Sequence, residues 1–485
     1  MYSRKVGKLF QIVYYTKILY FYYCIFYLFD GGNMLQIILS VGFCVLMLGV
    51  MVAVRIWQKK SIKKIYEDLK EKDYSYTLLI KGCDWGPAVD RMILAPGNHF
   101  DEFKPEDFDP KKFSVTVSTE RYLENGKLDY FTKQVEVTDA CPCDIDGNPL
   151  EGFDEAEEEG DDEPGGLNGG HILLTLKYGP KMGEINPFAY NFKTQQNNWK
   201  DKFDFTVEHP KLPEPIKVCS DWYCKEAQQF DDIKTGNELT ATSWCPPSDG
   251  KKHPLIVWLH GAGEGGTDPM IALLGNKVTA LVEPEIQSYF DGAYVLCPQN
   301  PTVWMQQGNT PYDILQQDSP NHVSKYTHSC KKVIDSFISK HDDIDRNRIY
   351  IGGCSNGGYM TINMLLNYPN FFAAAFPVCE AYSDSWLGDN DIKALGKVPL
   401  WFVAAKNDVT VDPEKHMIPT VRRCLELNGG SNVRMSLFDD VHNSFGEYFG
   451  HWSWIYLFNN ECVSEDEEVL WEWISEKELM EDSSK

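Results

Sequence analysis

The sequence predicts a chain of the α/β class, in which a large α/β domain follows a β-rich domain and an N-terminal membrane helix. Three features predict this: strands and helices alternating from residue 236 onward, short punctuated strands before it, and an uncharged apolar run near the start. A length of 485 residues fits two or three domains. Hydrophobic residues at 43% and aromatic residues at 13% supply enough apolar surface for folded cores.

The net charge of −25 is distributed unevenly along the chain, with 46 Lys and Arg against 71 Asp and Glu. Residues 1–65 contain nine basic residues and one acidic residue, so this end carries +8 and the remainder −33. Binding to nucleic acid needs clustered cations against phosphate, which the acidic body lacks, so we expect no nucleic-acid partner. The basic end suits a membrane surface.

An uncharged run of 21 residues, 34–54, predicts a transmembrane helix that spans a hydrocarbon core of about 30 Å. Trp57 and two lysine pairs follow it, as in an interfacial anchor, so the membrane segment is taken as 34–57. A buried helix and a cleaved signal peptide are the alternatives. A buried helix rarely lacks charge over this length, and a signal peptide carries its positive charges before the apolar run.

Residues 1–33 are rich in Tyr and Phe and end in Gly-Gly-Asn directly before Met34. A purine-rich run resembling a bacterial ribosome-binding site can encode that tripeptide, so we expect translation to start at Met34 and 1–33 to be an artefactual leader. A second membrane segment at about 18–29 is the alternative. We therefore expect a bacterial, single-pass, membrane-anchored protein. Positive charge after the span favours a cytoplasmic body, but the membrane side stays open.

A charged helical stalk is predicted for 58–75, and a β-sandwich for 76–235. In the second region short alternating strands are separated by turn clusters such as Ala95-Pro96-Gly97 and Asp146-Gly147-Asn148. Residues 154–170 are too acidic and glycine-rich to pack, which predicts a flexible acidic loop.

No metal or cofactor is expected. A calcium site at Asp144, Asp146 and Asn148 is the alternative, but their spacing departs from that of an EF-hand loop. The close pairs among the 14 cysteines lack His partners at zinc-ligand spacing, and the cysteines form no tight disulfide framework. Ordinary thiols are therefore predicted, in line with a cytoplasmic body.

From 236 to 485, apolar strands alternate with helices, which is typical of a mostly parallel sheet covered on both faces. The predicted strands are 255–259, 293–297, 348–352, 373–378, 400–405 and 433–438, and the clearest helices are 323–339 and 359–367.

The stretch 353–358 fits the pattern G-x-S-x-G around Ser355. A predicted strand runs into it and a predicted helix leaves it, which is the arrangement of a nucleophile elbow. The strained turn needs small neighbours, and the helix N-terminus directs partial positive charge toward a developing oxyanion. The pattern therefore predicts Ser355 as nucleophile and the N–H of Asn356 as an oxyanion donor.

A glycine-rich loop follows the first strand of this domain and begins at His260. Such a loop supplies the second main-chain N–H of an oxyanion hole, which we assign to Ala262. We expect His260, at the strand end, to support the loop and not to act as a base. A phosphate cradle is the alternative, but the loop lacks G-x-x-x-x-G-K-[ST].

The acid and the base are expected after later strands. Asp408 follows the strand 400–405 closely enough to orient a histidine, with Asp412 as the alternative. His442 and His451 both follow the strand 433–438. We favour His451, because a loop directly before the last helix can present the imidazole at the top of the sheet.

Residues 236–476 resemble the predicted-peptidase and polyhydroxybutyrate-depolymerase-like esterases of the α/β-hydrolase superfamily. The matching stretches are 254–264, 298–299, 345–359, 368–375 and 407–411, together with His451-Trp452-Ser453-Trp454, which matches the family pattern H-x-S-W. Residues 83–90 resemble the immunoglobulin-like N-terminal domain of some of these esterases. The resemblance implies a two-domain esterase and supports His451. Family members are usually exported, whereas the flanking charges here favour a cytoplasmic body.

Together the motifs predict a serine hydrolase that cleaves carboxylic esters, with Ser355, Asp408 and His451 as the triad and Ala262 and Asn356 at the oxyanion hole. The expected partners are a small ester substrate and, through the N-terminal helix, a membrane; a homo-oligomer is left open. A prolyl-oligopeptidase-like peptidase acting on short peptides is one alternative. A catalytically inactive, membrane-tethered binding module is another.

Overall fold

The computed structural model describes residues 74–150, 170–310, 313–319, 321–428 and 432–479. The predicted leader, membrane segment and nearly all of the stalk and acidic loop lie outside these described residues. Within the described ranges, no helix combines the length and the apolar character needed to cross a membrane. Residues 74–485 form one unit.

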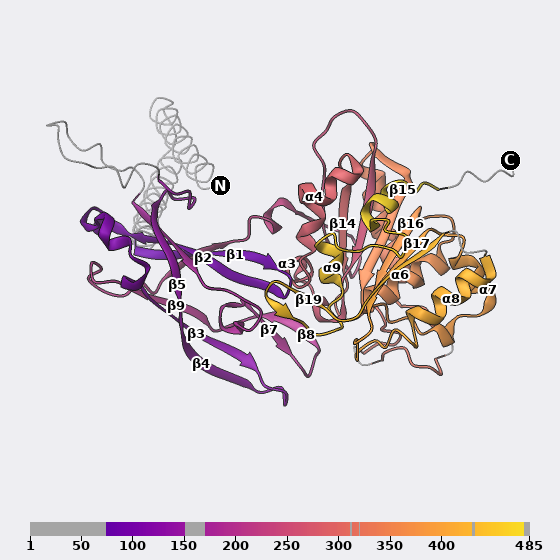
Figure 1. The fold of residues 1–485 in the computed structure, drawn as a ribbon, viewed down its shortest axis with the longest axis horizontal. Helices are drawn as coiled ribbons and strands as arrows, with labels where there is room; N and C mark the ends of the chain where they lie inside the picture. Colours follow the sequence, from indigo (N-terminus) through magenta and orange to yellow (C-terminus); the bar gives the residue numbers. More distant parts are fainter. Residues whose placement is uncertain (1–73, 151–169, 311–312, 320, 429–431, 480–485) are drawn as a thin grey trace, which may run out of the picture. The chain divides into compact units, whose positions relative to one another are not determined.

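Two antiparallel-rich sheets and a hairpin form the N-terminal part of this unit (Figure 1). One sheet has the order β10-β1-β2-β6-β5, the other β4-β3-β9, and the hairpin is β7-β8. The strand bounds are β1 Tyr74–Cys83, β2 Gly86–Pro96, β3 Ser114–Tyr122, β4 Leu128–Val135, β5 Val137–Cys143, β6 His171–Leu176, β7 Phe188–Asn191, β8 Gln196–Trp199, β9 Phe203–Glu208 and β10 Cys219–Tyr223.

The two sheets pack face to face across one apolar core. The buried Tyr76 of β1 lies edge-on to Phe205 of β9, with ring centroids 6.0 Å apart, and its hydroxyl accepts a 3.0 Å hydrogen bond from the Phe205 N–H. Val115 and Val117 of β3 belong to the same core. Period-two alternation in these strands places such side chains on the inner face.

The C-terminal part is built on an eight-stranded sheet with the order β11-β12-β14-β13-β15-β16-β17-β18. The six strands from β14 to β18 in this order are parallel, and β11 and β12 add an antiparallel edge. The mostly parallel sheet predicted from the sequence is therefore confirmed. The strand bounds are β11 Asp231–Ile233, β12 Thr240–Trp244, β13 His253–Leu259, β14 Tyr294–Gln299, β15 Ile344–Cys354, β16 Ala374–Val378, β17 Leu400–Ala405 and β18 Val433–Phe438.

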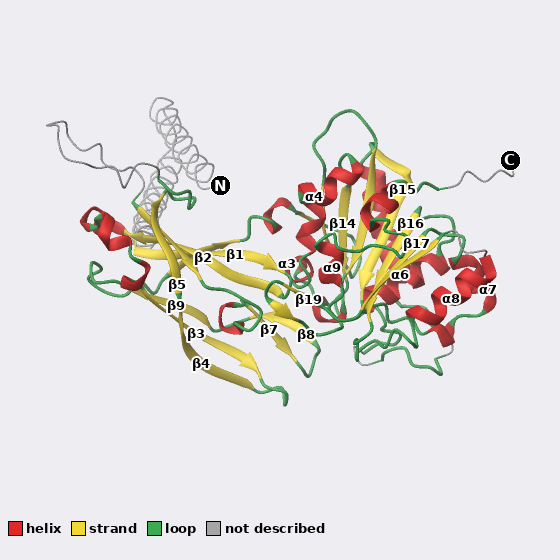
Figure 2. Cartoon of the chain, viewed as in Figure 1, coloured by secondary structure: helices red, strands yellow, loops and turns green. Residues whose placement is uncertain are grey.

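Helices cover both faces of this sheet (Figure 2). In β13, Ile256 and Trp258 face one core, while Leu255, Val257 and Leu259 face the other. The first core is closed by α3 Pro269–Leu274, α4 Pro284–Gln287, α9 Trp454–Phe458 and α10 Leu470–Ser475, and the second by α5 Thr327–Lys340, α6 Asn356–Asn367, α7 Asp389–Leu395 and α8 Met417–Asn428. Burial on two faces explains why these strands are continuously apolar.

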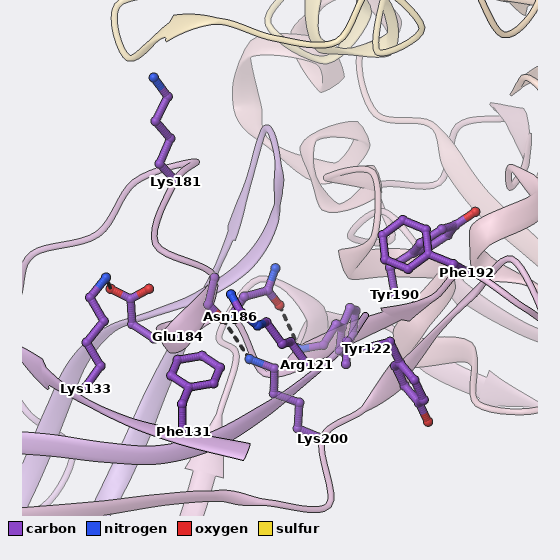
Figure 3. A pocket seen from close by; sticks show the side chains of 13 residues that line it. Arg121, Tyr122, Phe131, Lys133, Lys181, Glu184, Asn186, Tyr190, Phe192 and Lys200 are labelled. Carbon is purple, nitrogen blue, oxygen red and sulfur yellow. Dashed lines mark hydrogen bonds and ion pairs between the residues drawn. The ribbon is translucent and has the colours of Figure 1, made fainter. Parts of the chain in front are cut away.

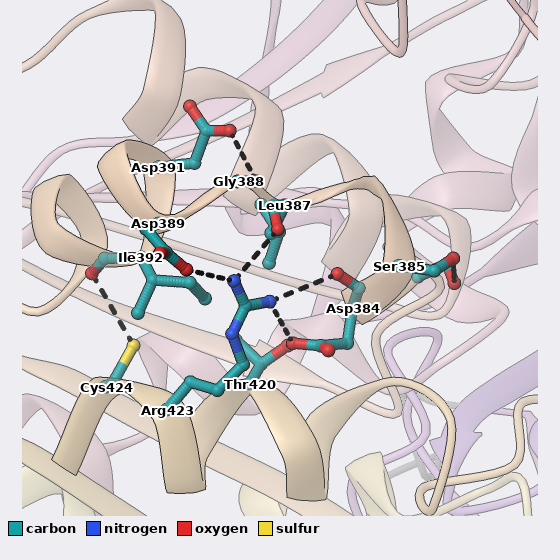
Figure 4. Close-up of polar contacts among 11 residues, drawn as sticks. Asp384, Ser385, Leu387, Gly388, Asp389, Asp391, Ile392, Thr420, Arg423 and Cys424 are labelled. Carbon is teal, nitrogen blue, oxygen red and sulfur yellow. Dashed lines mark hydrogen bonds and ion pairs between the residues drawn. The ribbon is translucent and has the colours of Figure 1, made fainter. Parts of the chain in front are cut away.

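Arg423 of α8 holds the loop that leads into α7 (Figure 4). Its guanidinium donates to Asp384 Oδ1 at 3.0 Å, to the carbonyl of Leu387 at 3.0 Å and to Asp389 Oδ1 at 3.2 Å. A planar guanidinium can satisfy several acceptors at once, so this one side chain fixes the segment that follows β16.

Candidate active site

Ser355 lies between β15 and α6 in a backbone conformation that side chains rarely adopt, with φ 56° and ψ −114°. Its N–H donates to the carbonyl of Val378 at 2.8 Å, which ties the turn to β16. The N–H of Asn356 is the first of α6, and the first N–H groups of a helix have no partner within it. The elbow therefore presents the Ser355 side chain and an available donor at the carboxyl ends of the parallel strands.

The glycine-rich loop after β13 lies directly against this elbow. A Cβ at Gly357 would lie 1.9 Å from the carbonyl oxygen of Leu259, and a Cβ at Gly353 would lie 2.5 Å from the same atom. On the loop side, a Cβ at Gly261 would lie 3.4 Å from the Cys354 sulfur. At 353 and 357 only glycine allows this approach, so these glycines let the end of β13 and the start of its loop lie against the turn that contains Ser355.

His260 holds the glycine-rich loop through hydrogen bonds of its ring, which agrees with the supporting role expected for a residue at a strand end. Its Nδ1 donates to the carbonyl of Gly261 at 2.6 Å, and its Nε2 accepts from the N–H of Asn300 at 3.1 Å. Burial lowers the pKa of His260 to about 4, so the ring is neutral near pH 7. Both ring nitrogens are occupied, which leaves none free to act as a base.

Asp408 and His451 contact each other at the end of the sheet. His451 Nδ1 lies 2.7 Å from Asp408 Oδ2, and both side chains are nearly buried. The other oxygen, Asp408 Oδ1, accepts from the N–H groups of Thr410 at 2.8 Å and Val411 at 3.0 Å. These bonds fix the carboxylate, so its second oxygen orients the imidazole and directs Nε2 away from Asp408.

Close packing brings the loop of His451 over the end of β17. A Cβ at Gly450 would lie 2.2 Å from Asn407 Oδ1 and 2.6 Å from the Asn407 carbonyl oxygen. Cys379, directly after the Val378 that binds Ser355, donates its N–H to Val403 of β17 at 2.7 Å. The Ser355 turn, the Asp408 turn and the His451 loop are therefore linked through adjacent strands β15, β16 and β17.

The two alternative residues lie elsewhere. Asp412 pairs with Lys415 at 2.9 Å and has a side chain 40% exposed. His442 forms part of a short strand, β19 His442–Asn443, which pairs with β20 Gly446–Glu447; its side chain is 65% exposed and its Nδ1 lies 2.5 Å from Asp440 Oδ1. Neither residue joins the contact between Asp408 and His451.

Several polar side chains that organise this region are absent from the motif-based prediction. Asn356 Oδ1 accepts from the N–H of Trp304 at 2.5 Å, so the residue after Ser355 also holds the loop beyond β14. Trp304 Nε1 donates to the carbonyl of His260 at 3.1 Å. Gln299 Nε2 donates to the carbonyl of Glu264 at 2.8 Å. Asn356 and the Pro298-Gln299 pair belong to the matching motifs, but those motifs predict none of these side-chain contacts, and Trp304 lies outside them.

A cavity of about 490 Å³ lies on the N-terminal sheets, among Arg121, Phe131, Lys133, Lys200 and other residues (Figure 3). Three of its four cations are already engaged: Arg121 pairs with Asp129, Lys133 with Glu184, and Lys200 Nζ donates to the carbonyl of Gly183 at 2.7 Å. We therefore assign no catalytic group to it.

Comparison with known proteins finds similarity to hydrolases in both sequence and fold. Residues 322–390, which include Ser355, match the model of the prolyl oligopeptidase family. A 128-residue stretch is 32% identical to poly(3-hydroxyalkanoate) depolymerase C of Paucimonas lemoignei; it is 26% of this chain and 27% of that protein. The chain thus spans about a quarter of the length of this curated relative.

The described fold also resembles a solved structure over most of its length. A thermostable esterase superposes with a TM-score of 0.61 at 23% sequence identity, covering 83% of this chain and 99% of the esterase chain. At this identity the likeness establishes the fold, in which both the N-terminal sheets and the eight-stranded sheet take part.

Proposed function

We propose, from the premise that this chain is an esterase-like α/β-hydrolase, that it cleaves carboxylic esters through an acyl-enzyme intermediate. The observation that carries the proposal is the 2.7 Å contact between His451 Nδ1 and Asp408 Oδ2, at the same end of the sheet as the Ser355 elbow. Nucleophile, orienting acid and base occur in the chain order Ser, Asp, His that α/β-hydrolases use.

In the proposed reaction, Ser355 Oγ attacks the ester carbonyl while His451 Nε2 accepts its proton. The Nδ1–H donated to Asp408 leaves the Nε2 lone pair free for this step, and the carboxylate stabilises the imidazolium that forms. His451 then protonates the leaving alkoxide. Water repeats the sequence on the acyl-enzyme and releases the carboxylic acid, restoring the serine.

The tetrahedral oxyanion is proposed to accept hydrogen bonds from the N–H groups of Ala262 and Asn356. Each such donor typically contributes about 3 kcal/mol to transition-state stabilisation, because it is already oriented before charge develops. The glycine contacts that press the loop against the elbow support this assignment.

An ester is favoured over an amide as substrate because an alkoxide demands less of the acid step than an amine. The prolyl oligopeptidase match supports a peptidase as second candidate. The test is hydrolysis of p-nitrophenyl butyrate beside a dipeptide p-nitroanilide, before and after treatment with a p-nitrophenyl phosphonate. We expect the ester to be cleaved faster than the anilide. We also expect the phosphonate to label the peptide that contains Ser355 and to abolish ester cleavage. Intact activity after phosphonylation, or faster anilide cleavage, would contradict the proposal.

Asp408→Asn is expected to lower kcat for the ester by about 10³- to 10⁴-fold, because an amide favours the wrong imidazole tautomer. Asp412→Asn is the matched control: its carboxylate is bound to Lys415 and the loss should stay within about threefold. Measurement of kcat for the two purified variants by steady-state kinetics shows which aspartate orients the histidine. Equal losses would remove Asp408 from the triad.

We further propose that the N-terminal sheets form an immunoglobulin-like sandwich and that residues 34–57 anchor the protein in a membrane. The antiparallel β1–β2, β2–β6 and β5–β6 pairs support the first proposal. The uncharged run and its basic flank support the second. Separation of membrane and supernatant fractions of cells expressing the full chain, with and without residues 34–57, tests the anchor.

A further inference from the structure

The hairpin β7-β8 of the N-terminal sheets contacts the loop that carries Ala262. Asn197 Nδ2 of β8 donates to Glu264 Oε1 at 3.2 Å, and Trp199 Nε1 donates to Asp268 Oδ2 at 2.7 Å. A Cβ at Gly263 would lie 3.4 Å from Asn197 Nδ2 and 3.7 Å from the Tyr190 ring. Side chains from outside the eight-stranded sheet therefore pack against the proposed oxyanion loop.

Glu264 is the residue of the loop that accepts the hydrogen bond from Asn197 of the hairpin. It is 5% exposed, and among the described residues it forms no ion pair. Burial raises the pKa of Glu264 to about 7, opposed by hydrogen bonds from the Asn197 side chain and from the main chain at Gly261 and Glu264. A buried carboxyl without a cation depends on such donors, because unpaired burial is costly.

The side chain of Glu264 packs against two glycines, at positions where a larger residue would collide with it. A Cβ at Gly275 would lie 2.6 Å from Glu264 Cγ, and a Cβ at Gly261 would lie 2.9 Å from Glu264 Oε2. On the main-chain side, Gln299 Nε2 holds the Glu264 carbonyl at 2.8 Å. A three-residue 3₁₀ turn, Ala262–Glu264, connects this fixed point to Ala262.

We propose that Asn197 and Glu264 act together as positioning residues, which set the direction of the Ala262 N–H by clamping the turn that carries it. The inference rests on the proposed ester hydrolysis and deepens it, because it makes a side chain of the N-terminal sheets part of the oxyanion machinery. A donor that binds the oxyanion only in the transition state affects kcat more than KM.

The test compares Asn197→Ala with Asn198→Ala in the full chain, using p-nitrophenyl butyrate at about pH 8, where Glu264 is mostly ionised. Asn198 is the matched control, because its Nδ2 donates to the Gln196 carbonyl at 3.3 Å and neighbours on a strand point to opposite faces. Asn197→Ala should lower kcat by roughly ten- to a hundredfold, the usual consequence of a misplaced catalytic group, with KM changed less than about threefold.

A second variant, Glu264→Gln, keeps the side-chain volume but offers one acceptor oxygen where the carboxylate offers two. It should also lower kcat. The kcat of the double variant should be no more than about threefold below that of the less active single variant, because the effects of coupled residues do not add. Equal kcat for the Asn197→Ala and Asn198→Ala proteins, or losses that multiply, would overturn the inference. If the wild-type chain does not hydrolyse the ester or react with the phosphonate, the proposed function itself fails, whatever the variants do.

Discussion

Ser355→Ala is expected to lower kcat for p-nitrophenyl butyrate by at least about 10⁴-fold, since loss of the nucleophile leaves only binding and the oxyanion donors. The variant should also fail to react with the phosphonate, which intact-protein mass spectrometry detects directly. Cys354 is the neighbouring nucleophile, and Cys354→Ala is the control. Burial raises the pKa of Cys354 well above its ordinary value, so its thiolate is not available, and this variant should keep the phosphonate reaction.

The same position provides a stability prediction. Ser355 holds φ at 56°, which costs a side chain about 1 to 3 kcal/mol and costs glycine little. Ser355→Gly should therefore be as inactive as Ser355→Ala but have the larger free energy of unfolding of the two. Urea denaturation of both variants measures the difference. A glycine variant that is less stable than the alanine variant would mean that the elbow is not strained in solution.

The strands that precede the candidate triad residues could be predicted from the sequence because both of their faces are buried. The expected strands 400–405 and 433–438 coincide with β17 and β18, since a central strand covered on both sides appears as an uninterrupted apolar run. Asp408 and the His451 loop follow these strands, so their placement at one end of the sheet follows from parallel order. The elbow was predictable for the same reason, as β15 enters it and α6 leaves it.

Edge and hairpin elements gave weaker signals. The strand β8, Gln196–Trp199, contains two asparagines and a glutamine, and its partner β7 has only four residues. Such short polar strands lack the alternation that identifies a half-buried strand. The edge strand β11, Asp231–Ile233, has three residues and begins before residue 236, where the α/β region was expected to start.

The contact between Asn197 and Glu264 joins residues 67 positions apart. No local pattern encodes such a pairing, because it depends on how the hairpin docks after both sheets have formed. Glu264 was visible as part of a glycine-rich motif, but its burial and its partner were not. The sequence offers both Asp408 and Asp412. They differ in burial and in partner, which are properties of the three-dimensional arrangement: Asp408 contacts His451, and Asp412 pairs with Lys415.

His451→Ala is expected to lower kcat by about 10⁴-fold or more, whereas His442→Ala should change it less than about threefold. His451 is nearly buried and its Nδ1 is held by Asp408, so its Nε2 is the available proton acceptor. His442 is mostly exposed and its Nδ1 is engaged by Asp440. Both residues lie in the segment between β18 and α9, so the pair controls for loop disturbance. Steady-state kinetics at saturating ester measures both effects.

Chemical rescue distinguishes two causes of inactivity in His451→Ala: removal of the imidazole base, and disturbed packing of the loop that contains it. Removal of the imidazole leaves a space beside Asp408, whose Oδ1 stays held by Thr410 and Val411. Added imidazole should therefore restore part of the activity of His451→Ala, with a dependence on the neutral form of the added base. A variant with disrupted packing around Gly450 would gain nothing, because the Asn407 turn that positions the site would itself have moved. If His442→Ala instead loses most of its kcat and added imidazole restores it, His442 is the base, and the contact between His451 and Asp408 is only structural.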